Sequence, residues 1–249
     1  ATGSGVGDGG AAGITGRCSV KDDVDTLGLA QIGSFDAVEL GYGIASGNDL
    51  DGDGDDEVVL STPFADSPAT DAGAAYVFAG PIAGGTTELG ALFTWTGISS
   101  TDNAATSVAL GDFDGDGEGD LFMTLPDSYE VVGLLGPLSA GTATSATWDV
   151  RADGQDYETI ALGDLTGDGI DELVIGDWGY SRVYVYEGGT SGALDSADRL
   201  STLDSTYSTI GLGTSVLANA DYDGDGQNDL IVGAPWTDEA VGPEEPAAV

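Results

Sequence analysis

Acidic side chains at alternate positions of short, glycine-containing segments are the residues of this chain best suited to chemistry. The pattern D-x-[DT]-G-D-G-x-x-[DE] occurs four times, over residues 49–57, 112–120, 164–172 and 221–229. Calcium takes six to eight oxygen ligands at roughly 2.3–2.6 Å, and carboxylates spaced in this way along a tight turn can converge on one ion. The sequence therefore predicts four calcium-binding loops.

Each loop position has an expected role. Positions one, three and five supply side-chain oxygens, position seven a backbone carbonyl oxygen and position nine a closing carboxylate. Glycine at position six permits the positive φ that turns the chain around the ion. The third loop carries Thr166 at position three and is expected to bind calcium most weakly. The predicted ligand residues are Asp49, Asp51, Asp53, Asp55, Glu57, Asp112, Asp114, Asp116, Glu118, Asp120, Asp164, Thr166, Asp168, Ile170, Glu172, Asp221, Asp223, Asp225, Gln227 and Asp229.

Two other interpretations of the loops are weaker. Asp and Gly are common in ordinary turns, but four copies in register, each with an acid at position nine, favour a bound ion. An EF-hand loop would carry a glutamate at position twelve. The residues at position twelve are apolar and belong to predicted strands: Leu60, Met123, Ile175 and Val232.

The segments around each loop predict four short strands per unit. An alternating segment precedes the loop, a hydrophobic run follows it, an aromatic and aliphatic segment comes third and a weaker segment fourth. Such a repeat is typical of a propeller blade, so we expect an all-β fold, a β-propeller of four-stranded blades with each calcium-binding loop between the first and second strands. The expected strands are residues 42–47, 58–60, 74–80 and 92–96 in the first unit, 106–111, 121–125, 130–136 and 147–151 in the second, 158–163, 173–175, 182–187 and 199–203 in the third, and 213–220 and 230–232 in the fourth.

The fourth unit lacks a third and a fourth strand, and the N-terminal segment resembles the missing pair. Residues 10–17 align with residues 73–80, and residues 27–33 match the weak fourth strand. Either the two ends combine into one blade and close a four-bladed ring, or the chain is a piece of a longer propeller. The expected domain covers residues 1–236, with an acidic tail or linker at 237–249.

The composition argues against several functions. The chain has five basic and 44 acidic residues, so its formal charge is −39. This charge disfavours nucleic acid and anionic lipid headgroups as partners. Histidine is absent and Cys18 is the only cysteine, so a His-based triad, a Cys/His pair or a typical zinc site is not expected, and the chain is predicted not to be an enzyme. No apolar run reaches the roughly 18 residues of a membrane span, so we expect no membrane insertion.

One stretch resembles a known repeat. Residues 226–235, Gly-Gln-Asn-Asp-Leu-Ile-Val-Gly-Ala-Pro, look like the FG-GAP repeat of integrin α propellers and their bacterial relatives. Residues 40–43 and 211–213 resemble its FG half, and residues 74–81 its third strand. The resemblance covers residues 40–236 and implies a propeller with calcium on one face and partner binding on the opposite face. In the first three units Thr62-Pro63, Leu125-Pro126 and Gly176-Asp177 stand where the GAP motif belongs.

Three aromatic residues, Phe64, Trp178 and Trp236, fall after the second strands, on that opposite face. We expect them to pack between blades, with an aromatic platform for a partner as the alternative. The predicted function is that of a calcium-binding extracellular module for adhesion or for interaction with a protein or glycan. The alternatives are an accessory, non-catalytic domain of a secreted hydrolase or lyase, and a structural surface protein.

Overall fold

The computed structural model describes residues 32–33, 39–82, 86–87, 90–100, 102–153, 159–205 and 210–236. The expectations for residues 1–31 and for the tail at 237–249 lie outside this part of the chain. Within it the regular structure is β-strand, apart from 3-10 turns at Pro126–Ser128 and at Gly90. The all-β prediction is therefore confirmed.

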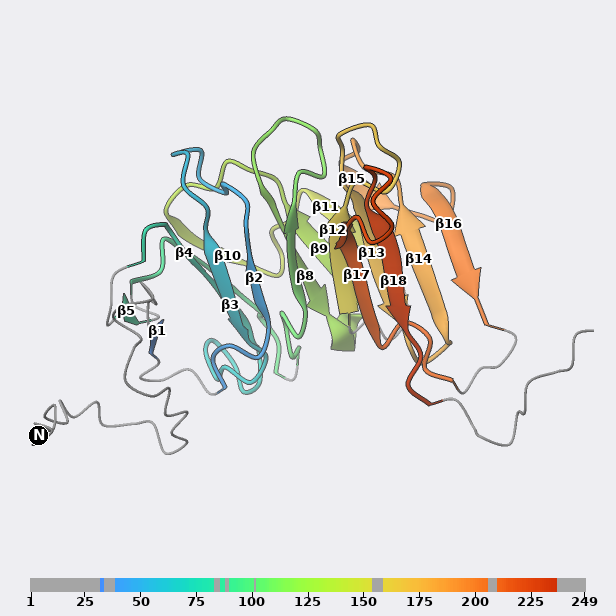
Figure 1. Ribbon diagram of the computed structural model, residues 1–249. Helices are drawn as coiled ribbons and strands as arrows, with labels where there is room; N and C mark the ends of the chain where they lie inside the picture. The colour runs from blue at the N-terminus through green and yellow to red at the C-terminus, as the bar shows by residue number, and fades with distance from the viewer. Residues whose placement is uncertain are drawn as a thin grey trace, which may run out of the picture.

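Each complete unit folds into a meander of consecutive antiparallel strands, and the units stand side by side in an open row (Figure 1). The fourth unit has two strands in the described part. The strands are β2 (Ile44–Ser46), β3 (Val58–Thr62), β4 (Ala74–Phe78) and β6 (Phe93–Thr96) in the first sheet, β7 (Val108–Gly111), β8 (Asp120–Leu125), β9 (Glu130–Leu134) and β11 (Val150–Asp153) in the second, β12 (Thr159–Gly163), β13 (Glu172–Asp177), β14 (Arg182–Tyr186) and β16 (Arg199–Asp204) in the third, and β17 (Ser215–Ala220) and β18 (Asp229–Gly233) in the fourth.

Extra strands, which the sequence pattern did not predict, join neighbouring units. β10 (Gly141–Thr144) lies between β9 and β11 in the sequence but pairs in parallel with β6 of the preceding unit. β15 (Gly192–Leu194) pairs in the same way with β11. The first and second sheets thus have five strands, so the prediction of four strands per sheet was incomplete.

The N-terminal pairing follows the same rule. β5 (Thr86–Thr87) lies between β4 and β6 in the sequence and pairs in parallel with β1 (Ile32–Gly33). Because β10 and β15 each join the fourth strand of the preceding unit, β1 occupies the place of a fourth strand. Of the predicted strand at residues 27–33, residues 27–31 lie outside the described part of the chain.

The hydrophobic core lies between the sheets. All six residues of β8 and of β13 are buried, because each of these second strands is covered on both faces by neighbouring sheets. One cluster joins the first and second sheets around Trp95 and Met123, a second joins the second and third sheets around Phe122 and Tyr186, and a smaller third cluster reaches Ala218 of the fourth. This packing holds the sheets, and the loops between their strands, in a fixed order.

Candidate metal centres

The four acidic loops occupy the predicted place. Each joins the first and second strands of its sheet, and Figure 1 shows the loops along one edge of the row. The position-six glycines adopt the expected positive φ, for example 96° at Gly54.

The first aspartate of each loop organises the turn. In the first loop, Asp49 Oδ1 accepts the N–H of Gly52 at 2.8 Å, and Oδ2 accepts the N–H of Gly54 at 2.8 Å. Both oxygens therefore point into the loop. The same two bonds recur at 2.6–3.0 Å in the other loops, from Gly115 and Gly117 to Asp112, from Gly167 and Gly169 to Asp164, and from Gly224 and Gly226 to Asp221.

Carboxylate oxygens converge in three of the four loops. In each of these loops, three carboxylate groups have an oxygen within 4.8 Å of an oxygen on the other two. Oxygens so placed can share one cation at the roughly 2.4 Å that calcium prefers, so the donor set fits this ion. The groups are Asp49, Asp51 and Asp53 in the first loop, Asp112, Asp114 and Asp120 in the second, and Asp221, Asp223 and Asp225 in the fourth.

In the third loop, as the structure describes it, three carboxylate groups do not converge in this way. Thr166 replaces the carboxylate at position three, and Asp164 and Asp168 remain at positions one and five. The third loop therefore offers fewer converging carboxylates than the other three, and its weaker affinity for calcium stays a prediction.

The position-nine acid ties each loop to its strands. Asp120 is fully buried, and its Oδ2 accepts the N–H of Phe113 at 2.7 Å and that of Asp114 at 3.2 Å. Its Oδ1 accepts the N–H of Gly136, beyond the third strand, at 2.9 Å. The equivalent acids also accept the N–H of position two, at 2.6–2.8 Å: Glu57 from Leu50, Glu172 from Leu165 and Asp229 from Tyr222.

Burial disfavours the charged form of these acids. It raises the pKa of Asp120 to about 6, although the N–H groups of Gly136 and Phe113 act in the opposite direction. Burial also raises the pKa of Glu57 and of Glu172, and neighbouring carboxylates add to both shifts. Opposite charge within a few ångströms lowers the pKa of a carboxyl group, so a divalent cation in the loop would reverse the shift.

The FG-GAP repeat family model matches residues 40–78 and 213–245. These two segments hold the first and fourth acidic loops with the strands on either side of them. The chain thus carries FG-GAP repeats in its first and fourth units. Its second and third units lie outside the matched segments, and they carry Leu125-Pro126 and Gly176-Asp177 in place of the GAP motif.

Successive loops of the FG-GAP protein are bonded to one another. The N–H of Gly119, at position eight, donates to the carbonyl oxygen of Asp49 in the preceding loop at 2.7 Å. The N–H of Asp171 bonds Asp112 in the same way at 2.9 Å, and the Asp171 carboxylate accepts the N–H of Asp112 at 2.9 Å. Sequence reasoning did not find Asp171, because its partner lies 59 residues away.

Position-seven side chains also contact the preceding loop, which the sequence did not indicate. A side chain at Gly115 would meet Ile170, and one at Gly167 would meet Gln227. Gly52 faces Glu118 in the same way. The side chains of Glu118, Ile170 and Gln227 therefore fill the junctions between units. Asp55 and Glu118 are not among the converging carboxylates of the described loops.

Aromatic residues of the FG-GAP protein gather at the opposite edge. Trp178 and Trp236, from neighbouring units, pack edge to face with centroids 5.1 Å apart, which confirms the predicted packing role for this pair. Phe64 packs against Tyr42 of its own unit at 6.0 Å. Trp236 is nevertheless 50% exposed, and Tyr42, Tyr129 and Tyr180 are about as exposed. In the described residues, no helix has the length and hydropathy needed to cross a membrane.

Proposed function

We propose that this FG-GAP repeat protein is a calcium-binding, extracellular β-propeller module that binds a protein or glycan partner and catalyses no reaction. Each sheet is one blade. The first, second and fourth loops each hold a calcium ion, and the third holds one more weakly. The observation that supports calcium binding most directly is the convergence of three carboxylates in each of three loops.

Calcium has a structural task in this proposal. The loops crowd carboxylates that repel one another, and the backbone bonds between successive loops place the crowded groups in a stack. A cation in each loop neutralises this charge and holds the adjoining strands. Since the ion binds the folded chain, it stabilises the fold by mass action.

Thermal unfolding in chelator and in millimolar calcium tests this claim. A site filled at 100 times its Kd adds about 2.7 kcal/mol, which for a chain of this size raises Tm by roughly 5–11 °C per site. Asp53→Ala and Asp225→Ala should each remove one such increment, whereas Asp66→Ala, a control outside the loops, should keep all of them. Equal Tm values in chelator and calcium would refute the structural role.

The partner surface lies opposite the loops. Tyr42, Tyr129, Tyr180 and Trp236 present half-exposed rings there, and tyrosine and tryptophan are frequent binding hot spots. Screening protein and glycan partners with the wild type and Tyr180→Ala tests this surface. Turnover of a polysaccharide or phosphodiester by the isolated chain would instead favour a catalytic function.

A further inference from the structure

Position eight of a loop sets how that loop meets the loop before it. In the second loop this position is Gly119, whose N–H donates to the carbonyl oxygen of Asp49 at 2.7 Å. In the third loop it is Asp171, whose N–H donates to Asp112 in the same way at 2.9 Å. The Asp171 carboxylate adds a second bond, because its Oδ2 accepts the N–H of Asp112 at 2.9 Å. The third loop therefore holds Asp112 at both its N–H and its carbonyl oxygen.

A glycine opens the space that the Asp171 carboxylate fills. A Cβ at Gly111 would collide with Oδ2 of Asp171. At the junction between the first and second loops, the equivalent of Gly111 is Asn48, and a Cβ at Gly119 would lie 2.7 Å from the Cβ of Asn48. The two junctions thus fill the same space from opposite sides, and of these two only the second places a carboxylate there.

The Asp171 carboxylate lies beside the first residue of both loops. Burial raises its pKa, the backbone N–H groups of Asp112 and Asp164 lower it, and the charges of the same two residues raise it again. Asp171 is also the chain neighbour of Glu172, the position-nine acid of the third loop, which accepts the N–H of Leu165 at 2.8 Å. The third loop thus holds Asp171, and Asp171 holds the first residue of the second loop.

We propose that Asp171 is a positioning residue that couples calcium binding in the second and third loops, so that an ion in either loop strengthens binding in the other. This inference rests on the proposed function. An ion in the third loop fixes Asp164 and Glu172, and with them the Asp171 carboxylate. Asp112 is then already ordered, so the second loop loses less conformational freedom when its own ion binds. The coupling is reciprocal, and it assists the third loop, which lacks a carboxylate at position three.

A calcium titration followed by NMR tests this coupling loop by loop. The amide signals of Gly117 and Gly169 report the second and third loops, because each N–H bonds the first aspartate of its own loop, at 3.0 and 2.9 Å. Asp168→Ala disables the third loop and should raise the Kd of the second loop by about fivefold or more. Asp114→Ala disables the second loop and should raise the Kd of the third by the same factor. This ratio of Kd values is the coupling factor.

Asp171→Asn should remove the coupling while keeping the shape of the side chain. Its NH₂ group would face an N–H donor where the carboxylate offers an oxygen, so the coupling factor should fall to about one, the value for independent sites. Asp53→Ala disables the first loop and should leave the Kd of the second nearly unchanged, because Gly119 carries no carboxylate. The role of Asp171 is wrong if the factor survives in Asp171→Asn, or if Asp53→Ala raises this Kd as much as Asp168→Ala does.

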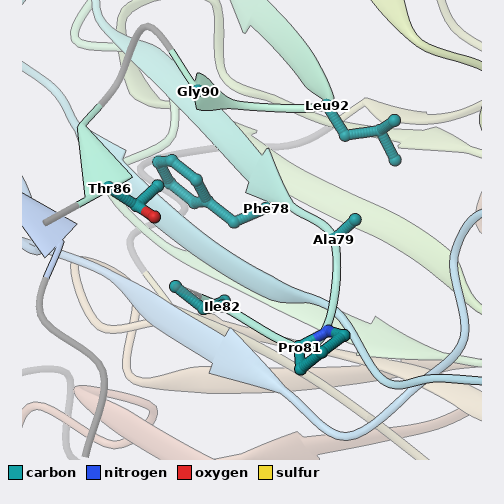
Figure 2. Close-up of a pocket in the computed structure, with 7 residues that line it drawn as sticks. All are labelled: Phe78, Ala79, Pro81, Ile82, Thr86, Gly90 and Leu92. Atoms are coloured by element: carbon teal, nitrogen blue, oxygen red, sulfur yellow. The ribbon is translucent and has the colours of Figure 1, made fainter. Parts of the chain in front are cut away.

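Asp56→Asn is the matched control for the substitution itself. Asp56 holds position eight of the first loop, and a Cβ at Gly80 would meet its carbonyl oxygen, just as one at Gly188 would meet that of Asp171. The residues on both sides of Gly80 line the pocket of the first unit shown in Figure 2, away from the junction of the second and third loops. Residues 1–48 carry no further copy of the acidic motif. The same loss of charge at Asp56 should therefore leave the coupling factor at its wild-type value.

Hydrogen exchange gives a readout that is independent of an ion in the second loop. In Asp114→Ala, calcium that fills the third loop should slow exchange of the Asp112 N–H relative to chelator, and adding Asp171→Asn should abolish this difference. Unchanged exchange at Asp112 in Asp114→Ala would overturn the coupling. If Gly117 and Gly169 respond to calcium independently of each other, the coupling fails and the calcium function stands. If neither signal responds, the calcium function fails and the coupling fails with it.

Discussion

Replacing Asp120 with alanine tests whether the position-nine acid holds the fold independently of any ion. The carboxylate accepts three backbone N–H groups, two of them at 2.7 and 2.9 Å. Each buried donor left without a partner costs about 1–3 kcal/mol. Removing a buried charge offsets part of this cost at neutral pH, because burial raises the pKa of Asp120. We expect a net loss of about 3 kcal/mol in chelator, or roughly 6–12 °C in Tm.

Asp116→Ala is the matched variant in the same loop. Asp116 is exposed, and its side chain accepts one N–H, from Glu118 at 2.9 Å. In chelator its effect should stay within about 0.5 kcal/mol, as for most surface substitutions. Urea unfolding of both variants, with and without calcium, measures the difference. If Asp120→Ala matches the wild type in chelator, or if the two variants unfold together, the structural role of Asp120 is wrong.

Further predictions concern packing and pH. Gly163→Ala should cost several kcal/mol by urea unfolding, because a Cβ there would collide with the backbone of Ala218 where β12 meets β17. Trp236→Ala should lower stability by about 1–2 kcal/mol, equally with and without calcium, since it loses the edge-to-face contact with Trp178. In calcium-depleted buffer Tm should rise as pH falls from 7 toward 5. The folded-state pKa of Asp120, about 6, exceeds that of the unfolded chain, so the stability it confers is present at low pH and is lost as pH rises through 6. A Tm that falls as the pH is lowered from 7 to 5 would contradict the raised pKa of Asp120.

The loops and principal strands could be predicted because their signals are local. The nine loop residues, with their acids and position-six glycine, define the turn, and the apolar run directly after them defines the strand that follows. The bonds from Gly52 and Gly54 to Asp49 span only three and five residues. The recurrence of the acidic motif and its place between two strand-like segments were therefore enough to locate each loop between its strands.

The connections between units could not be read in this way. Residues 141–144, Gly-Thr-Ala-Thr, show no hydrophobic alternation, and they form a strand because their backbone pairs with Phe93–Thr96 of the preceding sheet. Asp171 and Ile170 hold loop positions at which the four repeats carry different residues, so the sequence gives them no role. In the structure both contact the preceding loop. These contacts join residues more than 40 positions apart, so no local pattern predicts them.

The parallel strands β10 and β15 mean that sequence repeats and folded units do not share boundaries. A truncation at the end of the first repeat, before Val108, would delete β10 and leave the backbone of β6 bare along one side. Bare strand edges invite aggregation. Excised or recombined versions of this protein should therefore carry the crossover segment of the following repeat, and swapping repeats as independent cassettes should yield insoluble product.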